Sequence, residues 1–285
     1  MKNILVLTDF SENAKAAEKY ALQLAIHVKG NLILYNTFSR QSEKISGNVV
    51  WPHSTPSSEL QSISNLQTRV NELNHELGKI KDNIHKPEIR HLGNAGSLTG
   101  KLNEIITQNN IWLCVMGTKG ESFANNVLFG SNVFKVVEKI GCPVLIIPKE
   151  AEYRKLKKIA YATDFRSSDV DIINWLYKLA DPLKIGLILV HVSSDTIMDN
   201  EKDILKSQEQ IYRAQFPKTT IEIYEGKNIQ ESLHKIAEQL DVSLLALMHR
   251  RHEFFESLFH ASVSHKMIKH TEIPVLIFRE AKNDQ

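Results

Sequence analysis

Residues 113–148 read LCVMGTKGESFANNVLFGSNVFKVVEKIGCPVLIIP, and this stretch decides the fold of the chain. It begins with a short apolar run that predicts a buried strand, and a loop containing glycines follows directly. The loop leads into a predicted helix that Gly141 ends. One face of that helix carries apolar residues at the spacing i, i+3, i+4 and i+7, namely Val133, Val136, Val137 and Ile140. The apolar run between Pro143 and Pro148 predicts a final strand.

The loop between this strand and this helix has the composition of a phosphate-binding loop. Gly117 and Gly120 follow the strand, and glycine lets the main chain approach a ligand with no Cβ in the way. Gly130 and Ser131 open the helix, where free N–H groups and the helix dipole favour an anion. The loop therefore predicts a phosphate cradle at the carboxyl end of a strand. The alternative interpretation is a set of turn glycines with a capping serine.

The spacing Gly117-x2-Gly120-x9-Gly130-Ser131 resembles the ATP-binding signature of the universal stress protein family. Asp9, which follows the first predicted strand, matches the same family. The resemblance covers the whole chain as two tandem copies, of which only the first keeps the glycines. It implies an adenine nucleotide alpha hydrolase-like fold, with ATP as the ligand and Mg²⁺ as its accompanying metal. The binding residues that it implies are Thr8, Asp9, Gly117, Thr118, Lys119, Gly120, Gly130, Ser131 and Asn132.

Asp9 and Lys119 each have a second interpretation. Asp9 could satisfy backbone donors at the start of the following helix, and this use is compatible with a place near the adenosine or its metal. Lys119 could pair with phosphate oxygens or be a solvated loop lysine.

Internal repetition supports the tandem organisation. The sequence ILVLTDF at 4–10 is echoed by IAYATDF at 159–165, and CPVLI at 142–146 is echoed by IPVLI at 273–277. The repeats predict one domain at 1–149 and a second, degenerate domain at 155–281. Strands and helices alternate in both copies, so we expect an α/β protein with two tandem, doubly wound, five-stranded parallel sheets.

The first copy shows the expected order of elements. Its strands are predicted at 3–8, 31–37, 87–92, 111–116 and 144–147. A helix begins after the N-cap Ser11 and is ended by Gly30, and further helices are predicted at 59–83 and 97–109. Residues 39–58 are polar and rich in serine, which predicts a loop that is either disordered or a functional flap.

The second copy has lost the glycine loop. MGTKG at 116–120 corresponds to MHRRH at 248–252, and LFGS at 128–131 corresponds to LFHAS at 258–262. We therefore expect the second copy to bind no ATP. This copy is rich in histidine, but no cysteine or carboxylate pattern completes a four-ligand zinc site, and we expect no metal. Five of its histidines cluster near the C-terminal end, namely His249, His252, His260, His265 and His270.

Composition narrows the function classes. The formal charge is only +2, and no basic cluster is interleaved with aromatic residues, so we expect no nucleic-acid partner. No apolar run approaches membrane-spanning length, and the N-terminus lacks a signal-peptide core. The two cysteines lie in or beside predicted strands and suit reduced thiols. We expect a cytoplasmic protein.

The function predicted from these features is an ATP-binding stress-response or regulatory module. No Ser/His/Asp or Cys/His nucleophile set stands out, which favours a binding protein over an enzyme. The alternatives are a slow ATPase or adenylate-handling enzyme, and a scaffold that binds no nucleotide. The last strand of each copy is an apolar edge candidate, and in the family this strand mediates dimerisation. We therefore expect the two halves to pack as a pseudo-dimer, and the chain to form a homodimer.

Overall fold

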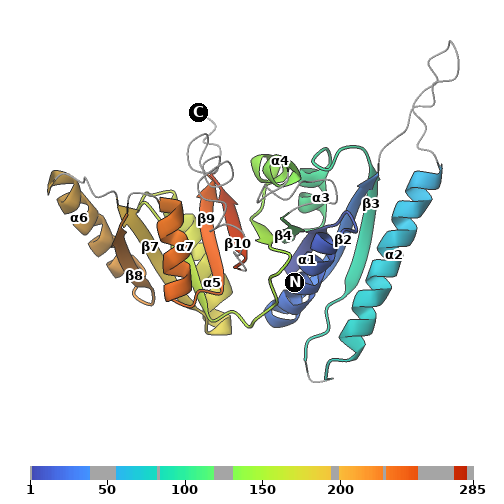
Figure 1. Cartoon of the computed structure of the whole chain (residues 1–285), viewed down its shortest axis with the longest axis horizontal. Coiled ribbons are helices and arrows are strands. Elements are labelled where there is room, and N and C mark those ends of the chain that lie inside the picture. The colour runs from blue at the N-terminus through green and yellow to red at the C-terminus, as the bar shows by residue number, and fades with distance from the viewer. Residues whose placement is uncertain are drawn as a thin grey trace, which may run out of the picture. The chain divides into compact units, whose positions relative to one another are not determined.

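The structure is a computed structural model of the 285-residue chain. It describes residues 2–38, 56–81, 84–118, 131–193, 199–226, 229–249 and 273–280. The chain divides into two compact units, Met1–Tyr153 (unit 1) and Arg154–Gln285 (unit 2) (Figure 1). No helix within these ranges is long and apolar enough to cross a membrane.

Unit 1 is built on a five-stranded parallel sheet with the order β3-β2-β1-β4-β5. The chain runs from β1 outward to β3, then returns to the other side of β1 for β4 and β5. Right-handed crossovers therefore place α1 and α2 on one face and α3 and α4 on the other. The elements are β1 (Lys2–Leu7), α1 (Glu12–Val28), β2 (Gly30–Phe38), α2 (Pro56–Gly78), β3 (Ile89–Ala95), α3 (Leu102–Gln108), β4 (Ile111–Gly117), α4 (Ser131–Lys139) and β5 (Val144–Ile147). The doubly wound fold is confirmed.

The start of α1 agrees with the sequence, whereas its end does not. Ser11 is the N-cap, and its side chain accepts a hydrogen bond from the amide of Ala14. The helix ends at Val28, and its C-cap Lys29 adopts the left-handed conformation with φ 54°. The prediction that Gly30 ends the helix is wrong. Gly30 is the first residue of β2, and a Cβ there would lie 2.7 Å from the carbonyl oxygen of Lys2 on the neighbouring strand.

Two other helices of unit 1 differ from their predicted bounds. Residues 56–58 were predicted to be part of the loop at 39–58, but they belong to α2. The rest of the predicted loop, 39–55, lies outside the described residues. The helix α3 is confined to Leu102–Gln108 rather than 97–109. The turn before it explains the difference, because the amide of Gly100 bonds the carbonyl of Ser97 and Lys101 has φ −115° and ψ 6°, so the helix begins only after Lys101.

The core of unit 1 lies between the sheet and its helices. The strand β1 contributes Ile4, Leu5 and Val6, each 0% exposed. The amphipathic helix α2 buries one stripe against β2 and β3, namely Leu66, Val70, Leu73 and Leu77. These positions recur at helical spacing, which explains why a helix with so polar a sequence packs stably on the sheet.

Unit 2 repeats the arrangement of unit 1. Its strands have the order β10-β9-β6-β7-β8 and are parallel, so β6 takes the place of β1 and β9 that of β4. The elements are β6 (Lys158–Ala162), α5 (Asp169–Leu183), β7 (Gly186–Ser193), α6 (Asp199–Gln215), β8 (Thr220–Glu225), α7 (Ile229–Gln239), β9 (Leu244–His249) and β10 (Val275–Arg279). The segment between β9 and β10 contributes residues 250–272, which lie outside the described ranges.

The last strands, β5 and β10, each stand at one edge of the sheet of their own unit. An apolar strand at the edge of a sheet has backbone groups open to a partner strand. The pairing of the two halves stays a prediction.

Candidate functional site

The predicted site of unit 1 lies where the strand order reverses. The strands β1 and β4 are parallel neighbours, and Val6 is level with Val115. Two residues further along each strand, Thr8 and Gly117 therefore reach the same edge of the sheet. A crevice at such a switch point, outside the carboxyl ends of the strands, is where open α/β sheets bind ligands. The structure thus brings Thr8 and Asp9, after β1, to the same edge of the sheet as Gly117 and Thr118, at the end of β4.

The other predicted residues fall on or before α4. Ser131 and Asn132 are the first two residues of this helix, and both are exposed. Free amide groups at a helix start are donors suited to an anion. Lys119, Gly120 and Gly130 lie outside the described residues, so their part in the site stays a prediction.

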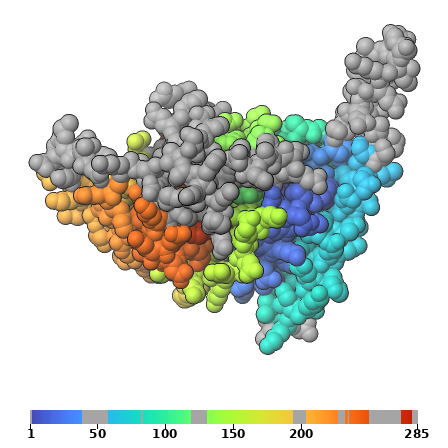
Figure 2. Space-filling view, viewed as in Figure 1, coloured from blue at the N-terminus to red at the C-terminus, as the bar shows by residue number. Residues whose placement is uncertain are grey.

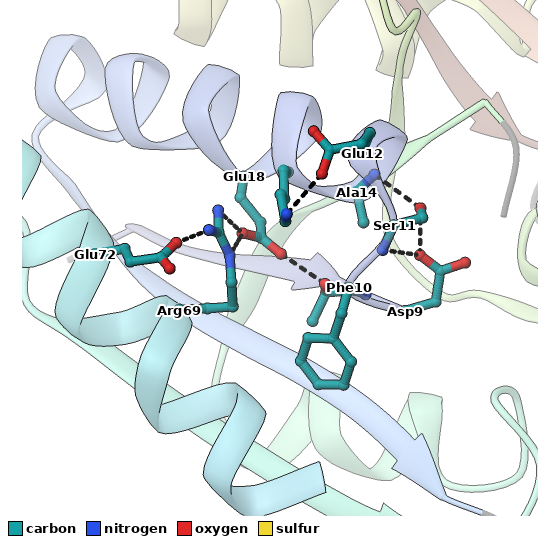
Figure 3. A network of polar contacts seen from close by, with 10 residues as sticks. Asp9, Phe10, Ser11, Glu12, Ala14, Glu18, Arg69 and Glu72 are labelled. Carbon is teal, nitrogen blue, oxygen red and sulfur yellow. Dashed lines mark hydrogen bonds and ion pairs between the residues drawn. The ribbon is translucent and has the colours of Figure 1, made fainter. Parts of the chain in front are cut away.

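Asp9 caps the turn between β1 and α1. Its Oδ1 atom accepts hydrogen bonds from the amide of Ser11 at 3.1 Å and from the Ser11 hydroxyl at 2.6 Å. The Asp9 side chain is exposed, and its other carboxylate oxygen points away from Ser11 (Figure 3). The backbone-capping interpretation of Asp9 is therefore correct, and the exposed oxygen leaves the carboxylate able to accept from a ligand as well.

Thr8 is held at both its hydroxyl and its carbonyl group. The hydroxyl donates to Glu18 Oε1 at 2.6 Å and accepts from the amide of Phe10 at 3.1 Å. The carbonyl oxygen accepts from Asn36 Nδ2 at 2.7 Å. Phe10 adopts the left-handed conformation, with φ 66°. Because residues with side chains rarely adopt this conformation, the bond from its amide to Thr8 is part of what holds the turn.

The network continues from Thr8 to Glu18 on α1. Figure 3 shows the ion pair of Glu18 with Arg69 on α2. Glu18 is 0% exposed and accepts from Arg69 Nε at 2.6 Å. Arg69 also pairs with Glu72 on its own helix. Burial raises the pKa of the Glu18 carboxyl group, while the hydrogen bond from Thr8 and the charge of Arg69 oppose that rise.

Sequence reasoning missed Glu18 and Arg69, although one signal was available. Glu18 lies four residues after Ala14 and three before Ala21, so it falls within the buried stripe of α1. Arg69 lies three residues after Leu66 and four before Leu73, within the buried stripe of α2. A charged residue at a core position of two helices on one sheet face indicates a buried pair.

Packing alone explains why residue 117 is a glycine. A Cβ at this position would lie 2.8 Å from the carbonyl oxygen of Asn13, in the first turn of α1. The close approach of β4 to α1 therefore requires glycine here, whatever else binds at this edge.

Unit 2 keeps the same turn but supports it differently. Thr163 donates to Asp169 Oδ2 at 2.6 Å and accepts from the amide of Phe165 at 2.8 Å. Phe165 has φ 56°, so the left-handed phenylalanine recurs. The carboxyl group comes from the first residue of α5 rather than from the second turn of the helix, as Glu18 does in α1. The carbonyl oxygen of Thr163 lies 2.8 Å from Nδ1 of His191, at the position of Asn36.

Aromatic side chains occupy the corresponding edge of unit 2. The ring of Phe165 stacks on His191 at 5.4 Å between centroids and contacts Tyr212 edge-on at 5.2 Å. His249 stands at the end of β9, where unit 1 has Gly117. His252, His260, His265 and His270 lie outside the described residues. Within the ranges that the structure describes, no group of three or more His, Cys, Asp or Glu residues could hold a metal ion.

Both cysteines are free thiols. Burial raises the pKa of Cys114 well above its usual value and that of Cys142 to about 12. Both thiols therefore stay protonated at neutral pH, which makes them poor nucleophiles.

The model of the universal stress protein family matches residues 1–148 and again residues 155–279. The chain belongs to the universal stress protein family. The two matches also make it a tandem member. A curated universal stress protein of Synechocystis sp. is 25% identical over 295 residues, which cover 98% of this chain and 100% of that protein.

Solved universal stress proteins share the fold. The crystal structure of a universal stress protein from Archaeoglobus fulgidus has a TM-score of 0.69 at 18% identity, and the match covers 98% of each chain. A universal stress protein in complex with cAMP is 21% identical, and the match covers 51% of this chain and 96% of that one with a TM-score of 0.36.

Proposed function

We propose that unit 1 binds ATP and that the protein is a nucleotide-dependent stress-response or regulatory module. The observation that carries this proposal is the meeting of Thr8 and Asp9 with Gly117 and Thr118 at the switch point of the sheet. A binding crevice is expected there, and the sequence places its glycine loop directly after β4.

The chemistry of these residues suits an adenine nucleotide. The triphosphate would lie on the amides of the loop from Gly117 to Gly130 and at the start of α4, where Ser131 and Asn132 are exposed. Lys119 would add a positive charge. The exposed carboxylate of Asp9 would accept from a ribose hydroxyl or hold a water of the accompanying Mg²⁺.

We further propose that unit 2 binds no ATP. At the corresponding edge His249 replaces Gly117, and the buried Phe165 packs between His191 and Tyr212. The imidazole of His249 fills volume that bare backbone leaves to a ligand at Gly117, and His191 stands where unit 1 has Asn36. Unit 2 would then be a structural or partner-facing copy.

Titration calorimetry with ATP on the full chain tests the assignment to unit 1. Gly130→Asp adds a carboxylate at the proposed phosphate site and should abolish measurable binding by charge repulsion. Ala261→Asp makes the matched change in unit 2 and should bind ATP as tightly as the wild type. Equal affinity in Gly130→Asp and wild type would remove the assigned site, and loss of binding in Ala261→Asp alone would move the site to unit 2.

We also propose that the protein acts in the cytoplasm and as a dimer. The free state of both cysteines is consistent with a reducing compartment. The short apolar strands β5 and β10 each stand at an edge of their unit, where a partner strand could pair. Light scattering on the full chain tests the dimer, and a purely monomeric mass at micromolar concentration would contradict it.

A further inference from the structure

We propose that Arg69 and Glu18 are positioning residues of the nucleotide site in unit 1. Their buried ion pair fixes the hydroxyl group of Thr8 and, through it, the turn that carries Asp9. The proposal rests on the proposed function for its ligand, while the effect on the turn can be measured without any ligand.

The chain of contacts is continuous from α2 to the turn (Figure 3). Arg69 Nε donates to Glu18 Oε2 at 2.6 Å, and Glu18 Oε1 accepts from Thr8 Oγ1 at 2.6 Å. The same hydroxyl oxygen accepts from the amide of Phe10 at 3.1 Å. Asp9 lies between Thr8 and Phe10, so its main chain is held on both sides.

The direction of these hydrogen bonds depends on the ion pair. A hydroxyl group has one proton, and because Thr8 gives it to Glu18, its lone pairs remain for the Phe10 amide. A carboxylate only accepts, whereas a protonated carboxyl can also donate. Without Arg69, the buried carboxyl would favour its protonated form and could donate to Thr8 instead. The Thr8 hydroxyl would then lose its fixed orientation.

A second connection runs from α2 to the same threonine. Ser62 donates to Asn36 Oδ1 at 2.6 Å, and Asn36 Nδ2 donates to the carbonyl oxygen of Thr8 at 2.7 Å. Ser62 and Asn36 are both buried. The helix α2 therefore reaches Thr8 at its hydroxyl and at its carbonyl, which is more than packing on the sheet requires.

The stability of the fold gives little reason for this ion pair. A buried pair is costly to desolvate, and well-packed apolar residues often replace it without loss. The helices α1 and α2 lie side by side at the surface (Figure 2). They are also joined by the exposed pair of Lys19 and Glu76, at 3.6 Å. Glu18 differs from Glu76 in being fully buried and in contacting Thr8.

The outer end of the chain of contacts lies at the surface. Arg69 and Glu72 line a groove of about 800 Å³ between α1 and α2, and the Glu72 side chain is half exposed. A change at the surface of α2 therefore has a direct connection to the turn at the site.

Hydrogen exchange of the Phe10 amide in the full chain tests the positioning role without a ligand. Arg69→Met should speed this exchange relative to the amides of α1, and Thr8→Val should do the same. Lys19→Met removes the exposed pair between the same helices and should leave the Phe10 amide at the wild-type rate. The double variant Glu18→Leu/Arg69→Met removes both buried charges, so it keeps the fold while leaving Thr8 without its acceptor.

ATP titration of the same variants tests the link to binding. Arg69→Met and the double variant should bind ATP about tenfold more weakly or worse, the effect of losing one positioning hydrogen bond. Thr8→Val should weaken binding similarly, and its effect should not add to that of the double variant. Lys19→Met should bind as the wild type does.

The outcomes separate the two proposals. Wild-type exchange at Phe10 in Arg69→Met and in the double variant would overturn the positioning role, as would wild-type ATP affinity in both. If the wild-type chain binds no ATP, the proposed function fails, and the exchange of the Phe10 amide still decides whether Arg69 holds the turn.

Discussion

The carbonyl oxygen of Asn13 lies against Gly117, so close that a Cβ on this glycine would be 2.8 Å from it. The first turn of α1 and the end of β4 therefore meet through bare main chain. This contact stands at the same edge of the sheet as Thr8 and Asp9. The glycine after β4 is required by packing before any ligand is considered.

The contact predicts the effect of adding a methyl group at Gly117. Gly117→Ala should destabilise the protein by about 1–3 kcal/mol, because overpacking against a main-chain oxygen forces the backbone to shift. Gly78→Ala is the matched control, since a Cβ there would have nothing within 4 Å. Urea denaturation measures both. A Gly117→Ala variant as stable as Gly78→Ala would contradict the close approach.

Arg69→Met should be one of the most destabilising single changes in unit 1. It leaves the fully buried Glu18 without its cation, and breaking a buried pair in this way costs about 3–5 kcal/mol. Changing Glu18 to Leu as well should recover most of the loss, because both charges are then gone. Thermal unfolding of the two variants checks this, and a double variant less stable than Arg69→Met would show that the pair itself stabilises the fold.

The Glu18 carboxyl group should make stability fall with rising pH. Its pKa is raised in the folded protein above the usual 4.5, so between these two values the folded state binds more protons than the unfolded state. The stabilisation of the folded state by Glu18 is therefore fully present below pH 4.5, and it is lost as the pH rises through the pKa of Glu18 in the folded protein.

The variant Glu18→Gln has no carboxyl group at this position. Comparing it with the wild type therefore isolates the contribution of Glu18 to the pH dependence of stability. The wild type should lose stability relative to Glu18→Gln as the pH increases across this window. Denaturant unfolding at several pH values measures the difference between the two proteins. A difference that is constant with pH, or that changes in the opposite direction, would mean that the folded pKa is not raised.

Replacing the left-handed C-cap residue of α1 or of α5 by glycine should stabilise the protein. Lys29 ends α1 with φ 54°, and Lys184 ends α5 with φ 56°. Lys29→Gly and Lys184→Gly should each stabilise by about 0.5–1 kcal/mol, because glycine adopts this conformation without strain. Lys19→Gly, inside α1, should destabilise by about 1 kcal/mol instead. Chemical denaturation compares the three, and a loss of stability at Lys29 would argue against its left-handed conformation.

The positions of the strands could be predicted from the sequence more accurately than the ends of the helices. The five strands of unit 1 were identified to within a few residues, and β1, β2, β4 and β5 were the clearest because buried strands are continuous apolar runs in sequence. The strand β3 is half exposed, and its predicted bounds differ the most. The end of α1 was misassigned to Gly30 since glycine is the usual residue in the left-handed position, and here Lys29 occupies it. The start of α3 was misplaced because the turn at Gly96 and Gly100 uses residues that a helix pattern tolerates.

The polar support of the site was not predicted. Glu18 and Arg69 are 51 residues apart, and only the packing of α2 beside α1 brings them together. The motif indicated Thr8 and Asp9 but not what holds them. By contrast, Ser11 was assigned correctly as the N-cap, because a cap depends on neighbours a few residues away.

The number of ATP molecules bound per chain tests the central claim most directly. Titration calorimetry of ATP with Mg²⁺ into the full-length protein should give one site per chain, held by unit 1. A stoichiometry of two would contradict the proposal that His249 and the aromatic residues around Phe165 exclude the nucleotide from unit 2. No binding at millimolar ATP would contradict the nucleotide site altogether.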